Sequence, residues 1–279
     1  MKIRLLLAVA CLWANVLSGN AQTDSIRVET WLREGCALPA DSNRCLFYAM
    51  QMMGTPYAAG TLEGEGGERL IVRTDSVDCT TFVETVLALV LADADGVPAF
   101  TRFKQRLRQI RYRSGVIDGY ASRLHYFSDW VCDNERKRFV EERTCALGGK
   151  RLYITLDFMT GHPDAYPALR NDTSEIRRMK DVERRWRNRC VCYIPKGELN
   201  KKAGELGIRN GDILALTTSV DGLDVVHMGF ACLVGDEVHL LHASSAEGRV
   251  VLDTRTLFQY SAPKRTHTGV RVVSCVAGR

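Results

Sequence analysis

The chain has 279 residues, of which 38 are basic and 33 acidic, so its net charge is +5. This mild excess does not predict nucleic-acid binding, because the basic run Arg177–Arg189 is interleaved with acidic residues, as on a solvated helix face. The length suits one large domain or a smaller core with a long insertion.

The first residues have the pattern of a secretory signal peptide. Two basic residues precede the apolar run Leu5–Leu17, and small residues follow in Ser18–Ala21. We expect cleavage after Ala21, which leaves an exported mature chain of 258 residues with a charge of +3. The apolar run is too short to span a membrane, and no later stretch is long enough. Cys11 offers an alternative lipoprotein site, although the usual leucine three residues before it is missing.

The cysteine count fits an oxidising compartment. Nine cysteines remain after cleavage, and eight remain to pair if Cys79 is free. Cys36 with Cys45 and Cys132 with Cys145 are the most local disulfide options, and the sequence alone does not fix the pairing. Cys190-Val191-Cys192 is not a zinc motif by itself, since two further ligands have no obvious source, and we expect neither a metal nor another cofactor.

The first part of the mature chain is predicted to be largely helical. Apolar residues at helical spacing predict one or two helices over residues 24–53, and Gly54–Tyr57 ends the pattern. A glycine-rich loop, Gly60–Gly67, then leads to a short strand over Arg69–Arg73. An apolar helix follows from Cys79 onward.

The rest of the chain divides near Pro195. Residues 92–195 form a long insertion with a helix over Phe100–Ile110 and a polar-aromatic segment at Tyr120–Trp130. Short strands separated by turns come next, over Gly211–Leu216, Asp224–Val234 and Glu237–Ala243. Helices followed by an antiparallel sheet predict an α+β fold.

Cys79 is a candidate nucleophile because it begins an apolar helix. Asp78 can cap this helix, and the free N–H groups and positive dipole end are expected to favour the thiolate. Acyl transfer requires such a thiolate. The alternative is that Cys79 is a small buried apolar residue, as free cysteines often are.

Two histidines lie on the strands that flank the turn Gly235-Asp236. If Val234 faces Glu237 in a two-residue hairpin, His227 and His242 become diagonal neighbours on one face of the sheet. The same register places His239 on the other face. A cysteine nucleophile requires one histidine as base and a second polar group to orient it. The alternative is that the two histidines merely share a face of the sheet.

These motifs occur in the order and spacing typical of a known group of enzymes. The stretches that carry the likeness are Gly54–Tyr57, Asp78–Phe82, Gly211–Ile213, His227–Phe230 and His242–Ser244. They resemble the NlpC-type papain-like peptidoglycan hydrolases. Further stretches resemble the N-acetylmuramoyl-L-alanine amidase-like branch of that clan, namely Gly60–Glu63, Arg111–Gly115, Ser122–Tyr126 and Gly222–Val225. The likeness covers the chain from about residue 40 onward.

The resemblance implies a role for each matching residue. Cys79 is the nucleophile, His227 the base and His242 the residue that orients it. Tyr57 corresponds to the tyrosine beside the nucleophile, whose hydroxyl supports the oxyanion together with the Cys79 backbone N–H. Many clan members have Ser-Gly after the cysteine, where this chain has Thr80-Thr81. We therefore expect Thr80 to help shape a different subsite next to the nucleophile.

The resemblance also implies the fold and the reaction. It predicts a papain-like core over about residues 40–91 and 196–279, with the insertion at about 92–195, in one domain that spans residues 22–279. The implied activity is that of an exported, periplasmic or extracellular amidase that cuts between the N-acetylmuramoyl lactyl group and L-Ala of peptidoglycan or muropeptides. The alternatives are a γ-D-glutamyl-diamino acid endopeptidase, an inactive wall-binding protein and a thiol oxidoreductase, although the last lacks a Cys-x-x-Cys pair. The sequence does not specify an oligomeric state.

The insertion is expected to select the substrate. Arg123 suits the carboxylates of a muropeptide, and the ring of Trp130 suits a sugar. His125 lies between them in the sequence. The alternative is that all three serve loop structure and core packing.

Overall fold

The computed structural model describes residues 22–64 and 67–276. The predicted signal peptide and the alternative lipoprotein site at Cys11 lie outside these residues. Residues 22–36 form one helix. The other helices are α2 (Arg44–Gln51), α3 (Cys79–Ala94), α4 (Phe100–Arg111), α5 (Phe127–Arg136), α6 (Phe158–Gly161), α7 (Thr173–Arg184), α8 (Ala203–Leu206) and α9 (Leu257–Ser261). No helix in the described ranges has the length and apolar character needed to cross a membrane.

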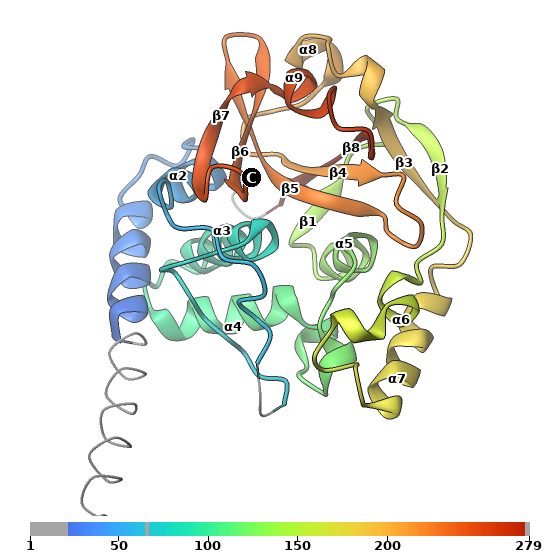
Figure 1. Ribbon diagram of the computed structural model, residues 1–279. Coiled ribbons are helices and arrows are strands. Elements are labelled where there is room, and N and C mark those ends of the chain that lie inside the picture. The colour runs from blue at the N-terminus through green and yellow to red at the C-terminus, as the bar shows by residue number, and fades with distance from the viewer. Residues whose placement is uncertain (1–21, 65–66, 277–279) are drawn as a thin grey trace, which may run out of the picture.

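Eight strands form one antiparallel sheet (Figure 1). They are β1 (Val140–Glu142), β2 (Lys150–Ile154), β3 (Arg189–Pro195), β4 (Ile213–Thr218), β5 (Val225–Val234), β6 (Glu237–Ser244), β7 (Arg249–Thr256) and β8 (His267–Cys275). Their order is β2-β3-β8-β4-β5-β6-β7, and β1 also pairs with β8. The mixed α+β fold predicted from the sequence is therefore confirmed.

The sheet separates two apolar layers because side chains alternate along each strand. In β4, Ile213 and Ala215 face the layer that contains α2, α3, α4 and α5, whereas Leu214 and Leu216 face the layer of α8 and α9. Figure 1 shows α3 and α4 below the sheet and α8 and α9 above it. The central helix is α3, which is apolar on all sides and buried along most of its length.

The insertion is part of the sheet and not an addition to it. Its strands β1 and β3 both pair with β8, and β2 pairs with β3. The sequence-based prediction of helices first and strands second missed these three strands; β1 and β2 are short and carry charged residues, whereas β3 is a longer and mostly apolar strand. A smaller apolar cluster lies between α6, α7 and the segment that precedes α5. The helices α4 and α5 of the insertion pack instead in the layer of α3.

The short strand predicted over Arg69–Arg73 is wrong. The structure assigns no strand to this segment. Side chains bind its backbone instead: Arg111 Nη1 donates to Ile71 O at 2.6 Å, and the Tyr112 hydroxyl donates to Arg69 O at 2.8 Å. These bonds satisfy carbonyl groups that a neighbouring strand would otherwise bind.

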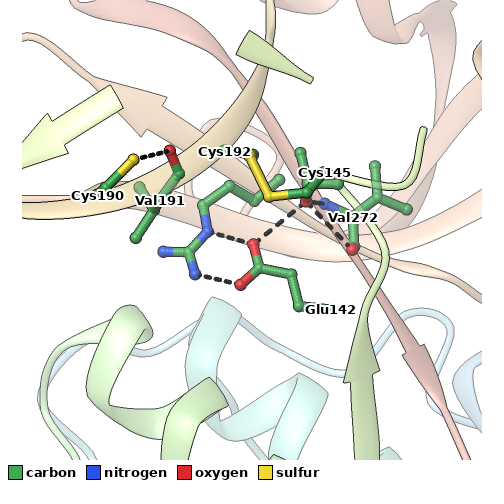
Figure 2. The surroundings of a disulfide bond; sticks show 8 residues. Glu142, Cys145, Cys190, Val191, Cys192 and Val272 are labelled. Carbon is green, nitrogen blue, oxygen red and sulfur yellow. Dashed lines mark hydrogen bonds and ion pairs between the residues drawn. A yellow bond between two sulfur atoms is a disulfide. The ribbon is translucent and has the colours of Figure 1, made fainter. Parts of the chain in front are cut away.

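The disulfide that forms is neither of the two local options that the sequence offers. Cys145 bonds to Cys192, 47 residues away, and neither Cys36–Cys45 nor Cys132–Cys145 forms. The bridge joins the segment after β1 to β3, which β8 holds side by side. Figure 2 shows the bridge near Glu142, with Cys190 outside it. The pairing of the strands decides that Cys192 is the partner of Cys145, and the spacing of cysteines in the sequence does not reveal this pairing.

Candidate active site

The start of α3 places Cys79 where the sequence predicts it. The Asp78 side chain accepts a hydrogen bond from Thr81 N at 2.8 Å, and Thr81 Oγ1 accepts one from Asp78 N at 2.9 Å. This reciprocal cap fixes the first turn of the helix. Cys79 is half-buried in that turn, so its sulfur lies next to the free N–H groups of the helix terminus.

The electrostatic expectation for this thiol is wrong in sign. Burial and, next, the Asp78 carboxylate raise the pKa of Cys79 to about 11. Hydrogen bonds from the Met228 N–H and from Thr80 to the sulfur lower this pKa, but by less. Cys79 therefore rests as a neutral thiol, because the desolvation of the charged form outweighs the helix terminus.

The hairpin register predicted from Gly235-Asp236 is confirmed. Val234 pairs with Glu237 and Cys232 with His239. A hydrogen bond of 2.6 Å joins His227 Nε2 to His242 Nδ1, and the two rings meet edge to face with centroids 4.8 Å apart. A side chain at Gly229 would come within 2.8 Å of His242 Cβ, so this glycine makes room for the pair.

Both histidines are neutral in this environment. Burial, followed by the neighbouring His242, lowers the pKa of His227 well below its ordinary value. Burial also lowers the pKa of His242 to about 4, although the Asp253 carboxylate acts in the opposite direction. The ring of Tyr260 packs on both imidazoles, with centroids 6.0 Å from His227 and 5.2 Å from His242. Because Nε2 of His227 is bound to His242, Nδ1 is the nitrogen left for Cys79.

Sequence reasoning missed Asp253 on β7. Its Oδ2 lies 3.6 Å from His242 Nε2, just beyond hydrogen-bond distance. The one signal in the sequence is a carboxylate that directly follows the apolar run Val250–Leu252. His242 pairs with Val251, so Asp253, two residues further along β7, is a diagonal neighbour of His242 on the same face of the sheet.

Cys79 and His227 line the same pocket. Met228, the residue after His227 on β5, also lines this pocket, where the start of α3 meets β5. The other residues that line the pocket are Thr80, Leu124, His125, Tyr126, Phe127, Trp130, Leu223, Asp224, Val225 and Val226. Most of these side chains are apolar, as is usual for a small-molecule site.

Tyr57 lies close to the nucleophile, as the resemblance implies. Its backbone N–H donates to Gly248 O at 2.8 Å, and Tyr57 forms an isolated bridge with Val77, two residues before Cys79. Burial and the proximity of Cys79 raise the pKa of its phenol. The hydroxyl is thus kept protonated and able to donate a hydrogen bond.

The structure brings three of the four predicted substrate residues into the pocket. Thr80 and His125 line it, and His125 Nε2 is bound to Tyr120 O at 2.9 Å. Burial and then Arg123 lower the pKa of His125 well below its ordinary value, so the ring is neutral and its Nδ1 is an acceptor. Trp130 also lines the pocket, but it is only 2% exposed and stacks on Phe127. The geometry does not present its ring face to a sugar.

Arg123 does not line this pocket. Its guanidinium pairs with Glu63 at 2.7 Å and with Glu68 at 3.4 Å, and it lies over the Tyr120 ring at 4.8 Å. Arg123 is 5% exposed, so these internal partners occupy it. Arg123 therefore forms buried ion pairs with Glu63 and Glu68, which join the insertion to the loop after Gly60.

No three His, Cys, Asp or Glu side chains come together as metal ligands within residues 22–64 and 67–276. Cys190 and Cys192 take different roles, because Cys192 is in the disulfide and Cys190 is exposed. The polar groups of the site are the thiol of Cys79, the neutral imidazoles of His227 and His242, and the carboxylate of Asp253, in that order.

Comparison with known proteins identifies the family. A family model described as AmiA-like, N-acetylmuramoyl-L-alanine amidase-like, matches residues 48–268. A comparison with curated proteins found no match. The crystal structure of an N-acetylmuramoyl-L-alanine amidase from Bacteroides uniformis is 37% identical, covers 83% of this chain and 97% of its own, and superposes with a TM-score of 0.79.

Two further solved structures share the fold. A Bacteroides fragilis protein named a putative xylanase is 42% identical, with coverage of 81% of this chain and 98% of its own and a TM-score of 0.77. A Legionella pneumophila protein is 24% identical, with coverage of 92% and 95% and a TM-score of 0.68, which supports the fold alone. The family model spans most of the chain, and the chain therefore belongs to the AmiA-like, N-acetylmuramoyl-L-alanine amidase-like family.

Proposed function

We propose that this protein is an exported cysteine amidase with a papain-like, NlpC-type active site. Its substrate is peptidoglycan or a muropeptide, and it cuts between the muramoyl lactyl group and L-Ala. One observation carries the proposal: Cys79 begins a capped helix in the same pocket as His227, whose far ring nitrogen is bound to His242. Membership of the amidase-like family supports the choice of bond.

The first half of the reaction forms a thioester. As Cys79 Sγ attacks the lactyl carbonyl carbon, His227 Nδ1 takes the thiol proton, so thiolate forms only during attack. The carbonyl oxygen becomes an oxyanion, which the Cys79 backbone N–H and the Tyr57 hydroxyl stabilise. The carbon–nitrogen bond then breaks, and His227 gives its proton to the departing L-Ala nitrogen.

The second half restores the thiol. Water attacks the thioester carbonyl while His227 Nδ1 accepts one of its protons. The carbon–sulfur bond breaks, the lactyl carboxylic acid leaves with the sugar, and Cys79 regains its proton from His227. His242 holds the His227 ring through the 2.6 Å bond during both proton transfers.

The pocket does not suit glycosidase chemistry, to which the name of the Bacteroides fragilis structure refers. A glycosidase usually uses two carboxylates that flank the scissile bond. Among the described residues that line the pocket, Asp224 is the one carboxylate. Its Oδ2 accepts a hydrogen bond from Ser128 N at 2.6 Å and faces Arg271, so it caps the start of α5.

The test is digestion of a disaccharide-tripeptide followed by mass spectrometry of both products. The amidase releases free disaccharide and an intact tripeptide with a new L-Ala amino terminus. An endopeptidase leaves L-Ala-D-Glu on the sugar and releases a free diamino acid, and a glycosidase separates the two sugars. Either of these results would overturn the proposed bond.

Two variants separate the catalyst from the scaffold. Cys79→Ala is expected to abolish product formation. Cys190→Ala removes an exposed thiol outside the pocket and is the matched control, expected to retain wild-type turnover. An inactive wild-type protein that still binds muropeptides would instead support a wall-binding role.

A further inference from the structure

His242 has a polar atom that the proposed mechanism leaves without a role. The residue is fully buried, and its Nε2 has no hydrogen-bond partner among the described residues. This nitrogen faces the carboxylate of Asp253 at 3.6 Å. A buried polar atom without a hydrogen bond costs folding free energy, so the groups around Nε2 influence the protonation of the His242 ring.

The bond between the two histidines contains one proton, and its position decides whether His227 can act as a base. In one arrangement His227 Nε2–H donates to His242 Nδ1, so His227 Nδ1 has a free lone pair for the Cys79 proton. In the other, His242 Nδ1–H donates and His227 carries its proton on Nδ1. A neutral His227 with that proton cannot deprotonate Cys79.

Asp253 distinguishes these two arrangements. In the first, neutral His242 carries its proton on Nε2, where the N–H points toward the carboxylate. In the second, a lone pair on Nε2 faces the carboxylate oxygens, and the two repel each other. The carboxylate therefore favours the arrangement in which His227 is a base.

Asp253 is itself held as an anion. Arg255 Nε binds Oδ1 at 2.9 Å and Nη2 binds Oδ2 at 2.7 Å, and the Arg255 backbone N–H also donates to Oδ1. Burial alone would raise the pKa of Asp253, but these contacts leave it lowered. Arg255 and Lys264 both lie over the Tyr260 ring, whose edge meets His242, and His267 packs behind Tyr260.

We propose that Asp253 is a positioning residue that selects the base tautomer of His227 through the electrostatic attraction between its carboxylate and the Nε2–H of His242. It is the fourth member of a series that runs from Cys79 through His227 and His242. Its effect on hydrolysis rests on the proposed function, whereas its effect on the tautomers does not.

Asp253→Asn tests this role with little change in shape. An amide NH₂ in place of the carboxylate can donate to His242 Nε2, which favours the unproductive tautomer. The value of kcat is expected to fall about tenfold to a hundredfold, because the attraction between the carboxylate and the Nε2–H is lost, with KM little changed. Asp236→Asn, at the exposed turn of the β5–β6 hairpin, is the matched control.

Nitrogen-15 NMR of the histidines gives a readout that needs no hydrolysis. Wild-type protein is expected to show protonated Nε2 on both His227 and His242, and Asp253→Asn is expected to shift the protons to Nδ1. A wild-type His242 protonated on Nδ1 would overturn the proposal even if the variant failed to fold. Unchanged tautomers and unchanged kcat in a folded Asp253→Asn protein would also overturn it. If the protein proved not to be an amidase, the NMR measurement of the histidine tautomers would still test the role of Asp253.

Discussion

The neutral resting state of Cys79 predicts an unusual pH dependence of its reactivity. Its pKa, raised to about 11 by burial, leaves about one thiol in 10,000 ionised at pH 7. Because the thiolate is the species that alkylating reagents attack, the rate of modification by iodoacetamide should rise about tenfold per pH unit from pH 7 to pH 10. Peptide mapping by mass spectrometry at each pH gives the rate for Cys79 alone.

A preformed thiolate–imidazolium pair predicts a different curve. Modification of Cys79 would then be fast and nearly independent of pH between 6 and 8, because the thiolate would already be present. Such a plateau would refute the claim that Cys79 and His227 are both neutral at rest. The exposed Cys190 in the same digests verifies that the reagent is active at every pH. Hydrolysis should depend on pH differently from alkylation. The pKa of His227 is lowered well below 6.5, so this base stays neutral at and below pH 6.5. The value of kcat/KM should therefore stay level down to below pH 6.5.

Three further predictions concern the catalytic residues and the disulfide. Cys79→Ala should lower kcat by more than about 10⁴-fold with an unchanged melting temperature, as activity and thermal unfolding assays would show. His242→Asn should retain more activity than His242→Ala, which should lose up to about 10⁴-fold, because an amide oxygen can still accept from His227; equal losses would count against an orienting role. Removing the Cys145–Cys192 bridge should cost about 4 kcal/mol, given a loop of 47 residues, and urea unfolding with and without reductant measures this.

Local signals predicted the parts of the site that depend on neighbouring residues. The Asp78 cap gave the start of α3, and the Gly235-Asp236 turn gave the register that pairs His227 with His242. Both rest on short-range geometry, in which a cap or a two-residue turn leaves few choices.

Features that depend on distant strands were not predictable in this way. Asp253 lies beside His242 because β7 pairs with β6, and Cys145 reaches Cys192 because β1 and β3 share β8 as a partner. The sign of the Cys79 pKa shift also depends on tertiary structure, because burial by the pocket walls outweighs the helix terminus. Arg123 shows the same limit, since its partners Glu63 and Glu68 lie about 60 residues earlier in the sequence.

The central claim is that Cys79 attacks the lactyl carbonyl of the muramoyl group, and affinity labelling tests it most directly. A chloromethyl ketone built on the muramoyl lactyl carbon places an electrophile where the scissile carbonyl lies, and attack by sulfur releases chloride. The account predicts one label per protein, located on Cys79 by peptide mapping, and protection by excess muropeptide. Labelling of Cys36 or Cys190 instead, or continued hydrolysis with Cys79 fully labelled, would contradict it.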